Sequence, residues 1–197
     1  MRKVRKQESL QKAAVNWHKN METTKIKQAK AFGEMKGKFH YKNALQAPRL
    51  TKIVISAGVG SFKDKNKIKI AIDRLAKITG QLPASKGAKQ SVASYKTRQG
   101  DIVGLQVTLR GARMFDFLDK LIHIALPRTK DFRGLSKGAA DEMGNITLGI
   151  KEHTIFPEAS DEELKDVFGL AITIVTTAKS KEEVVDFLSI LGLPFKA

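Results

Sequence analysis

Apolar residues recur at helical spacing in two long segments of the chain, residues 65–78 and 112–126. A period of three to four residues places these side chains on one side of each helix, where they can be buried together. Gly80 is suited to end the first helix, and Pro127 is suited to end the second. The apolar positions are Ile68, Ile72, Leu75, Ala76 and Ile78 in the first helix and Met114, Phe115, Leu118, Leu121, Ile122 and Ala125 in the second.

Strand-like segments alternate with these helices and are bounded by turn residues such as Gly58 and Gly60. The pattern predicts strands at residues 51–57, 91–97, 102–110, 146–150 and 169–177, with an acidic helical turn at 160–166. A last helix should begin after Ser180, with Glu182 and Glu183 near its positive end. We therefore expect an α+β fold, a two-layer sandwich in which a mainly antiparallel sheet carries helices on one face.

The N-terminal part of the chain differs from the rest because it is charged and only weakly periodic. Its apolar residues that could form one face of a short helix are Leu10, Ala13, Ala14 and Trp17. No linker composition divides the remainder. We interpret residues 1–43 as a basic N-terminal extension with a helical segment and residues 44–197 as a single domain.

Charge is distributed unevenly along the chain. The 197 residues include 36 Lys and Arg against 20 Asp and Glu, a formal net charge of +16. Residues 1–47 hold 12 of the cations and 3 of the acids, residues 48–140 hold 19 and 6, and residues 141–197 hold 5 and 11. This asymmetry favours a polyanionic partner, because Lys and Arg displace the counterions condensed on phosphate. Five cations border the apolar helix at 112–126 as a basic rim: Arg110, Arg113, Arg128, Lys130 and Arg133.

Features of membrane and secreted proteins are not found. The apolar stretch at residues 170–178 is far shorter than the roughly 20 residues that span a bilayer, and the N-terminus lacks an apolar signal core. The sequence contains no cysteine. It therefore has no disulfides and no thiolate metal site, which fits a reducing cytosol.

Local motifs of catalysis and phosphate binding are also missing. The four histidines, His18, His40, His123 and His153, are too far apart for a motif such as HExxH. We interpret His123, which lies within an apolar helix, as a packed core residue. No glycine-rich run has the GxxxxGK[ST] form that cradles phosphates.

One pair of acids, Asp116 and Asp119, lies three residues apart on one helix. Arg113 and Lys120 lie beside this pair, which favours a solvated charged face over a catalytic carboxylate pair. Two-metal chemistry would need acids clustered in a basic cleft, whereas most acids lie in the least basic third of the chain. We therefore expect no enzyme, no metal and no cofactor.

Six blocks of sequence carry a resemblance to a known family. The first is TLRGARM, an apolar helix and LPRTKDFRGL, between residues 108 and 135. The others are QAPRLTKIVISAGVG at 46–60, ITGQLP at 78–83, SVASYKTRQG at 91–100, GNITLGIKEHTIFPE at 144–158 and GLAITIVTTAKSKEE at 169–183. In this order and spacing the chain, from about residue 43 to 197, resembles the bacterial family of large-subunit ribosomal protein five, which binds 5S rRNA.

The resemblance implies a structural constituent of the large subunit that anchors 5S rRNA in the central protuberance. It also implies contacts with 23S rRNA, peptidyl-site tRNA, neighbouring large-subunit proteins and a protein of the small-subunit head. The expected location is the cytoplasmic ribosome, with an organellar ribosome left open. Residues 1–25 lie before the position at which members of the family usually begin. Two interpretations of this segment stay open, a disordered tail and a segment that is ordered on rRNA. Rival hypotheses are a nucleic-acid-processing enzyme and a peripheral membrane protein, which RNA turnover or vesicle flotation would reveal.

Four polar or aromatic positions align with the family's rRNA contacts: Ser56, Gln81, Tyr95 and Thr108. Most family members have Asn at the position of Ser56 and Phe at that of Tyr95. The contact at Ser56 is therefore in doubt, while stacking on the Tyr95 ring should persist. The cations expected to meet the RNA backbone are Lys86, Lys89, Lys96, Arg98, Arg110, Arg113, Arg128 and Arg133.

A long loop is implied to approach the peptidyl-site tRNA. The family commonly reads FDGRGNY in this loop, whereas residues 140–146 read ADEMGNI. The loss of the Arg and of both aromatic residues weakens the implied tRNA contact. The residues that remain as candidates are Ser136, Lys137, Gly144 and Asn145.

Overall fold

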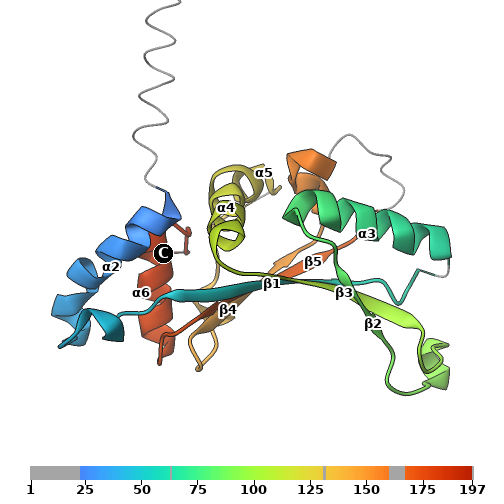
Figure 1. The fold of residues 1–197 in the computed structure, drawn as a ribbon, viewed down its shortest axis with the longest axis horizontal. Coiled ribbons are helices and arrows are strands. Elements are labelled where there is room, and N and C mark those ends of the chain that lie inside the picture. Colours follow the sequence, from blue (N-terminus) through green and yellow to red (C-terminus); the bar gives the residue numbers. More distant parts are fainter. Residues whose placement is uncertain (1–22, 63, 131, 160–166, 197) are drawn as a thin grey trace, which may run out of the picture.

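A five-stranded antiparallel sheet forms one layer of the molecule (Figure 1). The computed structural model describes residues 23–62, 64–130, 132–159 and 167–196. The strand order is β2-β3-β1-β5-β4. The strands are β1 (Leu50–Gly58), β2 (Ala84–Gly87), β3 (Ile102–Leu109), β4 (Asn145–Ile150) and β5 (Leu170–Thr176).

The helices lie together on one face of the sheet (Figure 1). They are α2 (Thr24–Phe39), α3 (Lys65–Thr79), α4 (Ala112–Lys120), α5 (Leu126–Arg128) and α6 (Lys181–Leu191). A π-helical turn, Leu121–Ala125, joins α4 to α5. This arrangement confirms the predicted α+β class, with a mainly antiparallel sheet and helices on one face.

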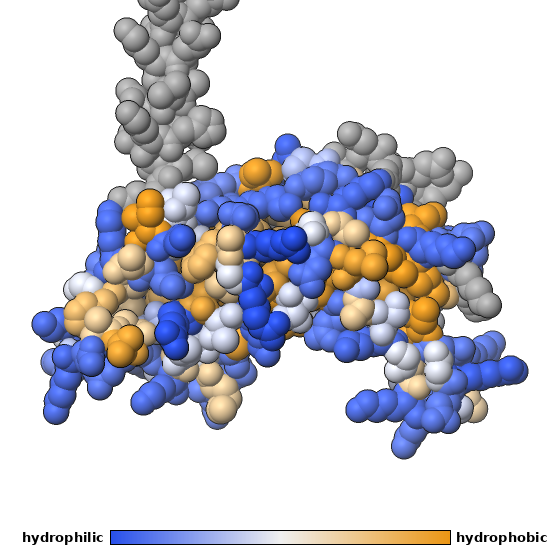
Figure 2. Space-filling view, viewed as in Figure 1, coloured by the Kyte–Doolittle hydropathy of each residue, from blue (hydrophilic) through white to orange (hydrophobic). Residues whose placement is uncertain are grey.

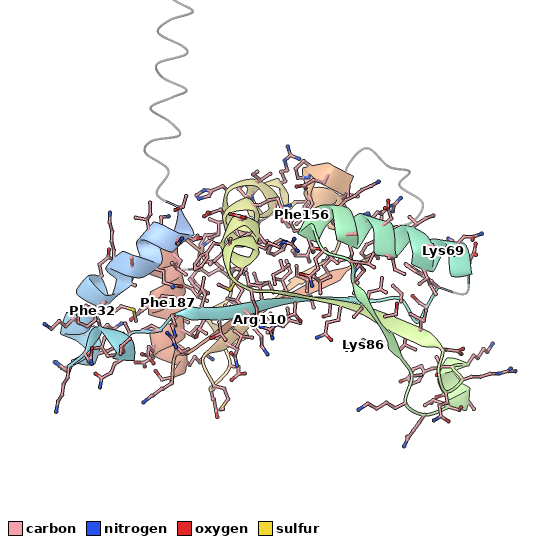
Figure 3. The ribbon with its side chains drawn as sticks, viewed as in Figure 1. Phe32, Lys69, Lys86, Arg110, Phe156 and Phe187 are labelled. Carbon is pink, nitrogen blue, oxygen red and sulfur yellow. The ribbon has the colours of Figure 1, made fainter. Side chains whose placement is uncertain are left out.

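The core lies between the two layers because the strands alternate. In β1, Ile53, Ile55 and Ala57 are buried, while the residues between them are more exposed. β3 and β5 repeat the pattern. Phe156 and Phe187 fill the helical side of the core and are fully buried (Figure 3).

Helix ends follow the local chemistry of the sequence. Gly80 ends α3 in a left-handed conformation, with φ of 66°, which favours glycine. The Ser180 hydroxyl accepts a hydrogen bond from the Glu183 N–H and caps α6, as predicted. Pro127 does not stop the second helix where the sequence suggested, because α5 continues to Arg128. A proline ring clashes with the carbonyl four residues earlier in a regular α-helix, and the wider π-helical turn directly before Pro127 relieves that clash.

Two strand assignments need correction. Residues 91–97 are not a strand: Ala93–Tyr95 forms a short 3₁₀ turn, and only Val92 and Thr97 pair, as an isolated bridge. The edge strand is β2 instead, and its four residues are all exposed. An exposed edge strand buries no side chains, so it leaves no apolar alternation in the sequence.

The histidine expected in the core is not buried. His123 is exposed beside the exposed Ile124, whereas Leu121, Ile122 and Ala125 of the same helix are buried in the core. Among the histidines that the structure describes, His153 is the buried one, and it stacks on Phe168 with ring centroids 4.2 Å apart. Its Nδ1 accepts a hydrogen bond from the Phe168 N–H, and Nε2 lies 3.3 Å from the guanidinium of buried Arg74.

Helix α2 packs against the body of the molecule, and Ala31 and Met35 join the common core. The Asp119 carboxylate accepts a hydrogen bond from the Thr24 N–H, so it has a structural contact as well as a place on a charged face. At the other end, the Tyr41 hydroxyl donates to Glu183 on α6, and burial together with this carboxylate raises the pKa of Tyr41. The predicted helical face at residues 10–17 and the acidic turn at 160–166 lie outside the described residues.

Candidate RNA-binding surface

The second face of the sheet carries serine, threonine and glutamine side chains with Val54 among them, and none of the described helices covers it (Figure 1). Ser56 in β1 pairs with Gln106 in β3, and Val54 pairs with Thr108. Side chains alternate between the faces of a strand, so Ser56, Gln106 and Thr108 share this face. The structure therefore brings Ser56 and Thr108 together as diagonal neighbours. We call this surface the open face.

Hydroxyl groups continue across the open face. Thr173 of β5 pairs with Val54 of β1 on one side and with Thr147 of β4 on the other. The Oγ1 atoms of the two threonines lie 3.0 Å apart. The Ser56 hydroxyl points along the same face and donates to the Ala171 carbonyl at 3.5 Å. The open face thus offers small donors and acceptors across four strands.

Cations flank the open face at two places. Lys86 of β2 pairs with Gly104, two residues before Gln106, which places its side chain on the open face. Arg110 follows the end of β3, two residues after Thr108, and is exposed. Both residues lie on the side of the sheet opposite the helices (Figure 3). The uncharged centre is therefore bordered by positive charge.

A projecting arm, residues 87–101, joins β2 to β3. It extends from the end of the sheet (Figure 1), and Figure 2 shows it as a mainly hydrophilic projection. Lys89, Lys96 and Arg98 are exposed on the arm, and Tyr95 is 79% exposed at its tip. A ring that makes so little contact with its own chain is available to stack on a base.

The tip of the arm has a defined backbone conformation. The Val92 and Thr97 main chains exchange hydrogen bonds of 3.1 and 3.3 Å across it. Lys96 adopts a left-handed conformation, with φ of 53°, which is uncommon for a residue with a side chain. Tyr95 and Lys96 are therefore presented by a turn that the rest of the arm holds in place.

Gln81 lies apart from the arm tip. It directly follows the Gly80 cap of α3, at the end of the helical layer, and its main chain is tied to the Thr79 hydroxyl. Two residues separate it from the β2 edge strand, which begins at Ala84. Gln81 therefore borders the sheet edge and does not join Ser56 and Thr108 on the open face.

The basic rim predicted around the apolar helix is not one cluster. Arg113 lies in the first turn of α4, next to the sheet, and Arg128 lies at the end of α5, away from it (Figure 1). At 1.5 Å per residue, the two are roughly 20 Å apart along the helix. Arg133 is exposed in the following loop. One compact ligand therefore cannot contact all of these cations.

The loop expected to approach tRNA is held by structural contacts. Gly144 has φ of 76°, and a Cβ atom there would lie 2.3 Å from the Ala178 carbonyl oxygen. The Asn145 amide donates to the Asp141 carboxylate at 3.3 Å. Ser136 caps a short 3₁₀ turn through the Gly138 N–H, and Lys137 is exposed. Gly144 and Asn145 thus shape the turn, while Lys137 remains free to reach solvent.

Sequence reasoning missed Gln106, Thr147 and Thr173. Strand alternation offered a signal for the first, because Gln106 lies two residues before Thr108 and must share its face. Nothing local identifies Thr147 or Thr173, because their place beside Val54 depends on pairing between distant strands.

Two other kinds of site are not found in the described ranges. None of the helices there combines the length and the apolar composition needed to cross a bilayer. Nor do three or more His, Asp or Glu side chains of those ranges gather where they could hold a metal ion.

Comparisons with known proteins agree on one family. Residues 43–98 match the family described as ribosomal protein L5, and residues 102–195 match the C-terminal region described for the same ribosomal family. The large ribosomal subunit protein uL5 of Thermoanaerobacter sp. (strain X514) is 48% identical over 159 residues, 80% of this chain and 89% of that protein. The uL5 protein of Desulfatibacillum aliphaticivorans is 48% identical over 164 residues, 83% of this chain and 92% of that protein. The chain therefore belongs to the ribosomal protein L5 family.

Proposed function

We propose that this protein is a structural, non-enzymatic constituent of the large ribosomal subunit that binds 5S rRNA through the open face and the arm. The observation that carries the proposal is the uncovered polar face between Lys86 and Arg110, continuous with an exposed arm. In this role the protein anchors 5S rRNA in the central protuberance of the cytoplasmic ribosome. It needs no cofactor or metal for this role.

The two parts of the surface suit different features of RNA. Hydroxyl and amide side chains such as Ser56, Gln106 and Thr108 can bond to 2′-hydroxyl groups and base edges, which lie in the wide, shallow minor groove of A-form RNA. Lys89, Lys96 and Arg98 can neutralise phosphates. Stacking on the exposed Tyr95 ring adds a contact with an unpaired base at a fixed place in 5S rRNA. The arm thus supplies charge and stacking, and the open face supplies hydrogen bonds.

Further contacts belong to other surfaces in this proposal. The distance between Arg113 and Arg128 supports a second RNA contact, with 23S rRNA, at the end of α5 away from the sheet. Peptidyl-site tRNA would meet Ser136 and Lys137, in a contact that is weaker because the turn lacks the usual Arg and aromatic residues. Neighbouring large-subunit proteins and a protein of the small-subunit head complete the expected partners.

Tyr95→Ala is expected to weaken 5S rRNA binding by roughly 1–3 kcal/mol, because it removes a stacking surface. Tyr95→Phe keeps the ring and should bind like the wild type. Binding curves with 5S rRNA and with an unrelated RNA of similar size provide the measurement. Equal losses on both RNAs after Tyr95→Ala would assign Tyr95 to a generic surface and remove it from the specific site.

Cell fractionation tests the proposed function as a whole. The protein is expected to be recovered in stoichiometric amounts with 50S particles and with an RNA of 5S size. Recovery with vesicles of anionic lipid, or turnover of RNA by the purified protein, would contradict the proposal.

A further inference from the structure

The arm and its flanking strands contain a single acidic residue. Between residues 82 and 109 the only Asp or Glu is Asp101, against Lys86, Lys89, Lys96 and Arg98. Asp101 is exposed at the base of the arm, directly before β3. On charge alone, an acid at this position opposes the binding of a phosphate backbone.

The Asp101 carboxylate is engaged with the main chain of the arm. Its Oδ2 atom accepts a hydrogen bond from the Arg98 N–H at 2.8 Å, and the Asp101 N–H donates to the Arg98 carbonyl at 3.1 Å. The two bonds close a four-residue turn in which Gly100 has φ of 91°. Main-chain bonds of 2.8 and 3.0 Å then connect Asp101 and Gly100 to Ala88, next to β2.

This turn ends the limb of the arm that carries the tip cations. Along the limb, the Thr97 N–H donates to the Val92 carbonyl and the Gln99 N–H donates to the Ser91 hydroxyl at 3.0 Å. Between these two amides, the Arg98 amide has the Asp101 side chain as its acceptor. Without that acceptor the limb would gain conformational freedom, and binding RNA would have to remove this freedom again.

We propose that Asp101 is a positioning residue of the RNA-binding arm, because its carboxylate fixes the turn that presents Lys96 and Arg98 to the phosphates. The affinity gained because the arm is ordered before binding exceeds the affinity lost through electrostatic repulsion between Asp101 and RNA. The inference rests on the proposed function, the binding of 5S rRNA.

Two substitutions distinguish the positioning effect of the Asp101 side chain from the effect of its negative charge. Asp101→Ala and Asp101→Asn remove the same negative charge, but only asparagine retains an oxygen that can accept the Arg98 N–H. Asp101→Ala is expected to weaken 5S rRNA binding about three- to tenfold. Asp101→Asn should bind as the wild type does, or up to about twofold more tightly. Glu34→Gln on α2, an exposed acid outside the arm, measures the effect of one unit of charge at a distant site.

Hydrogen exchange at the Arg98 amide of the free protein gives a second readout. The exchange should accelerate in Asp101→Ala and not in Asp101→Asn, while both variants unfold at the wild-type urea concentration because the side chain is exposed. If Asp101→Ala bound 5S rRNA as tightly as Asp101→Asn, charge alone would explain the residue and the inference would be wrong. If the wild type did not prefer 5S rRNA over unrelated RNA, the proposed function would be wrong. The proposed role of Asp101 in positioning RNA contacts would then be wrong as well.

Discussion

Replacing Lys86, Lys89, Lys96 and Arg98 together by glutamine is expected to lower the affinity for 5S rRNA about a thousandfold at roughly 0.1 M salt. Each of these cations can neutralise one phosphate and release its condensed counterion. The slope of log affinity against log salt concentration should therefore become shallower by about three units. Titrations of 5S rRNA at several salt concentrations measure both quantities.

A matched variant controls for the loss of net charge. Replacing Lys36, Lys42, Lys69 and Lys181 by glutamine also removes four positive charges, and these exposed residues lie outside the arm and the open face. We expect this variant to lose affinity only through weaker long-range attraction, with a slope close to that of the wild type. Identical slopes for the two variants would mean that Lys86 and the three arm cations do not contact phosphate.

Gly144→Ala is expected to reduce the free energy of unfolding by at least about 3 kcal/mol. The residue has φ of 76°, and an added Cβ would lie 2.3 Å from the Ala178 carbonyl oxygen, a main-chain atom that cannot rotate away. The Thr176 hydroxyl also donates to the Gly144 carbonyl at 2.6 Å, so the turn cannot shift without losing a buried hydrogen bond. Urea unfolding measures the change.

Gly149→Ala serves as the control for that substitution. Gly149 lies on β4, and no atom approaches within 4 Å of a Cβ placed there. Its replacement should change stability by less than about 1 kcal/mol. Equal stability of the two variants would show that the turn at Gly144 can rearrange, and would leave open a role for Gly144 in contact with tRNA.

Helices and strands that bury one face in the core could be predicted from the sequence. The helix at α3 and the strands β1 and β3 were placed within one residue at each end, because burial imposes a period on the apolar residues. Residues 91–97 were misassigned because Val92 and Tyr95 have strand-like composition but are exposed on the arm. β2 depends on pairing with β3, which local sequence does not encode.

The arrangement of the candidate site residues could likewise be predicted from the sequence only in part. Ser56 and Thr108 share the open face, whereas Gln81 and Tyr95 lie elsewhere on the surface. A strict helical projection would have placed His123 on the exposed side, opposite Leu121 and Ile122. The significance of Asp101 could not be read from the sequence, because an acid among cations indicates nothing until its acceptor role toward the Arg98 amide is seen.

As a member of the ribosomal protein L5 family, the protein is a structural and non-enzymatic component of the ribosome. Beyond family membership, we propose that the arm and the open face contact 5S rRNA. Chemical acylation of lysines, read by mass spectrometry with and without 5S rRNA, tests this claim most directly. If the arm and the open face contact 5S rRNA, Lys86, Lys89 and Lys96 are protected, and the reactivity of Lys36 and Lys181 is unchanged. Protection on the helical side alone, or no protection of the arm, would contradict it.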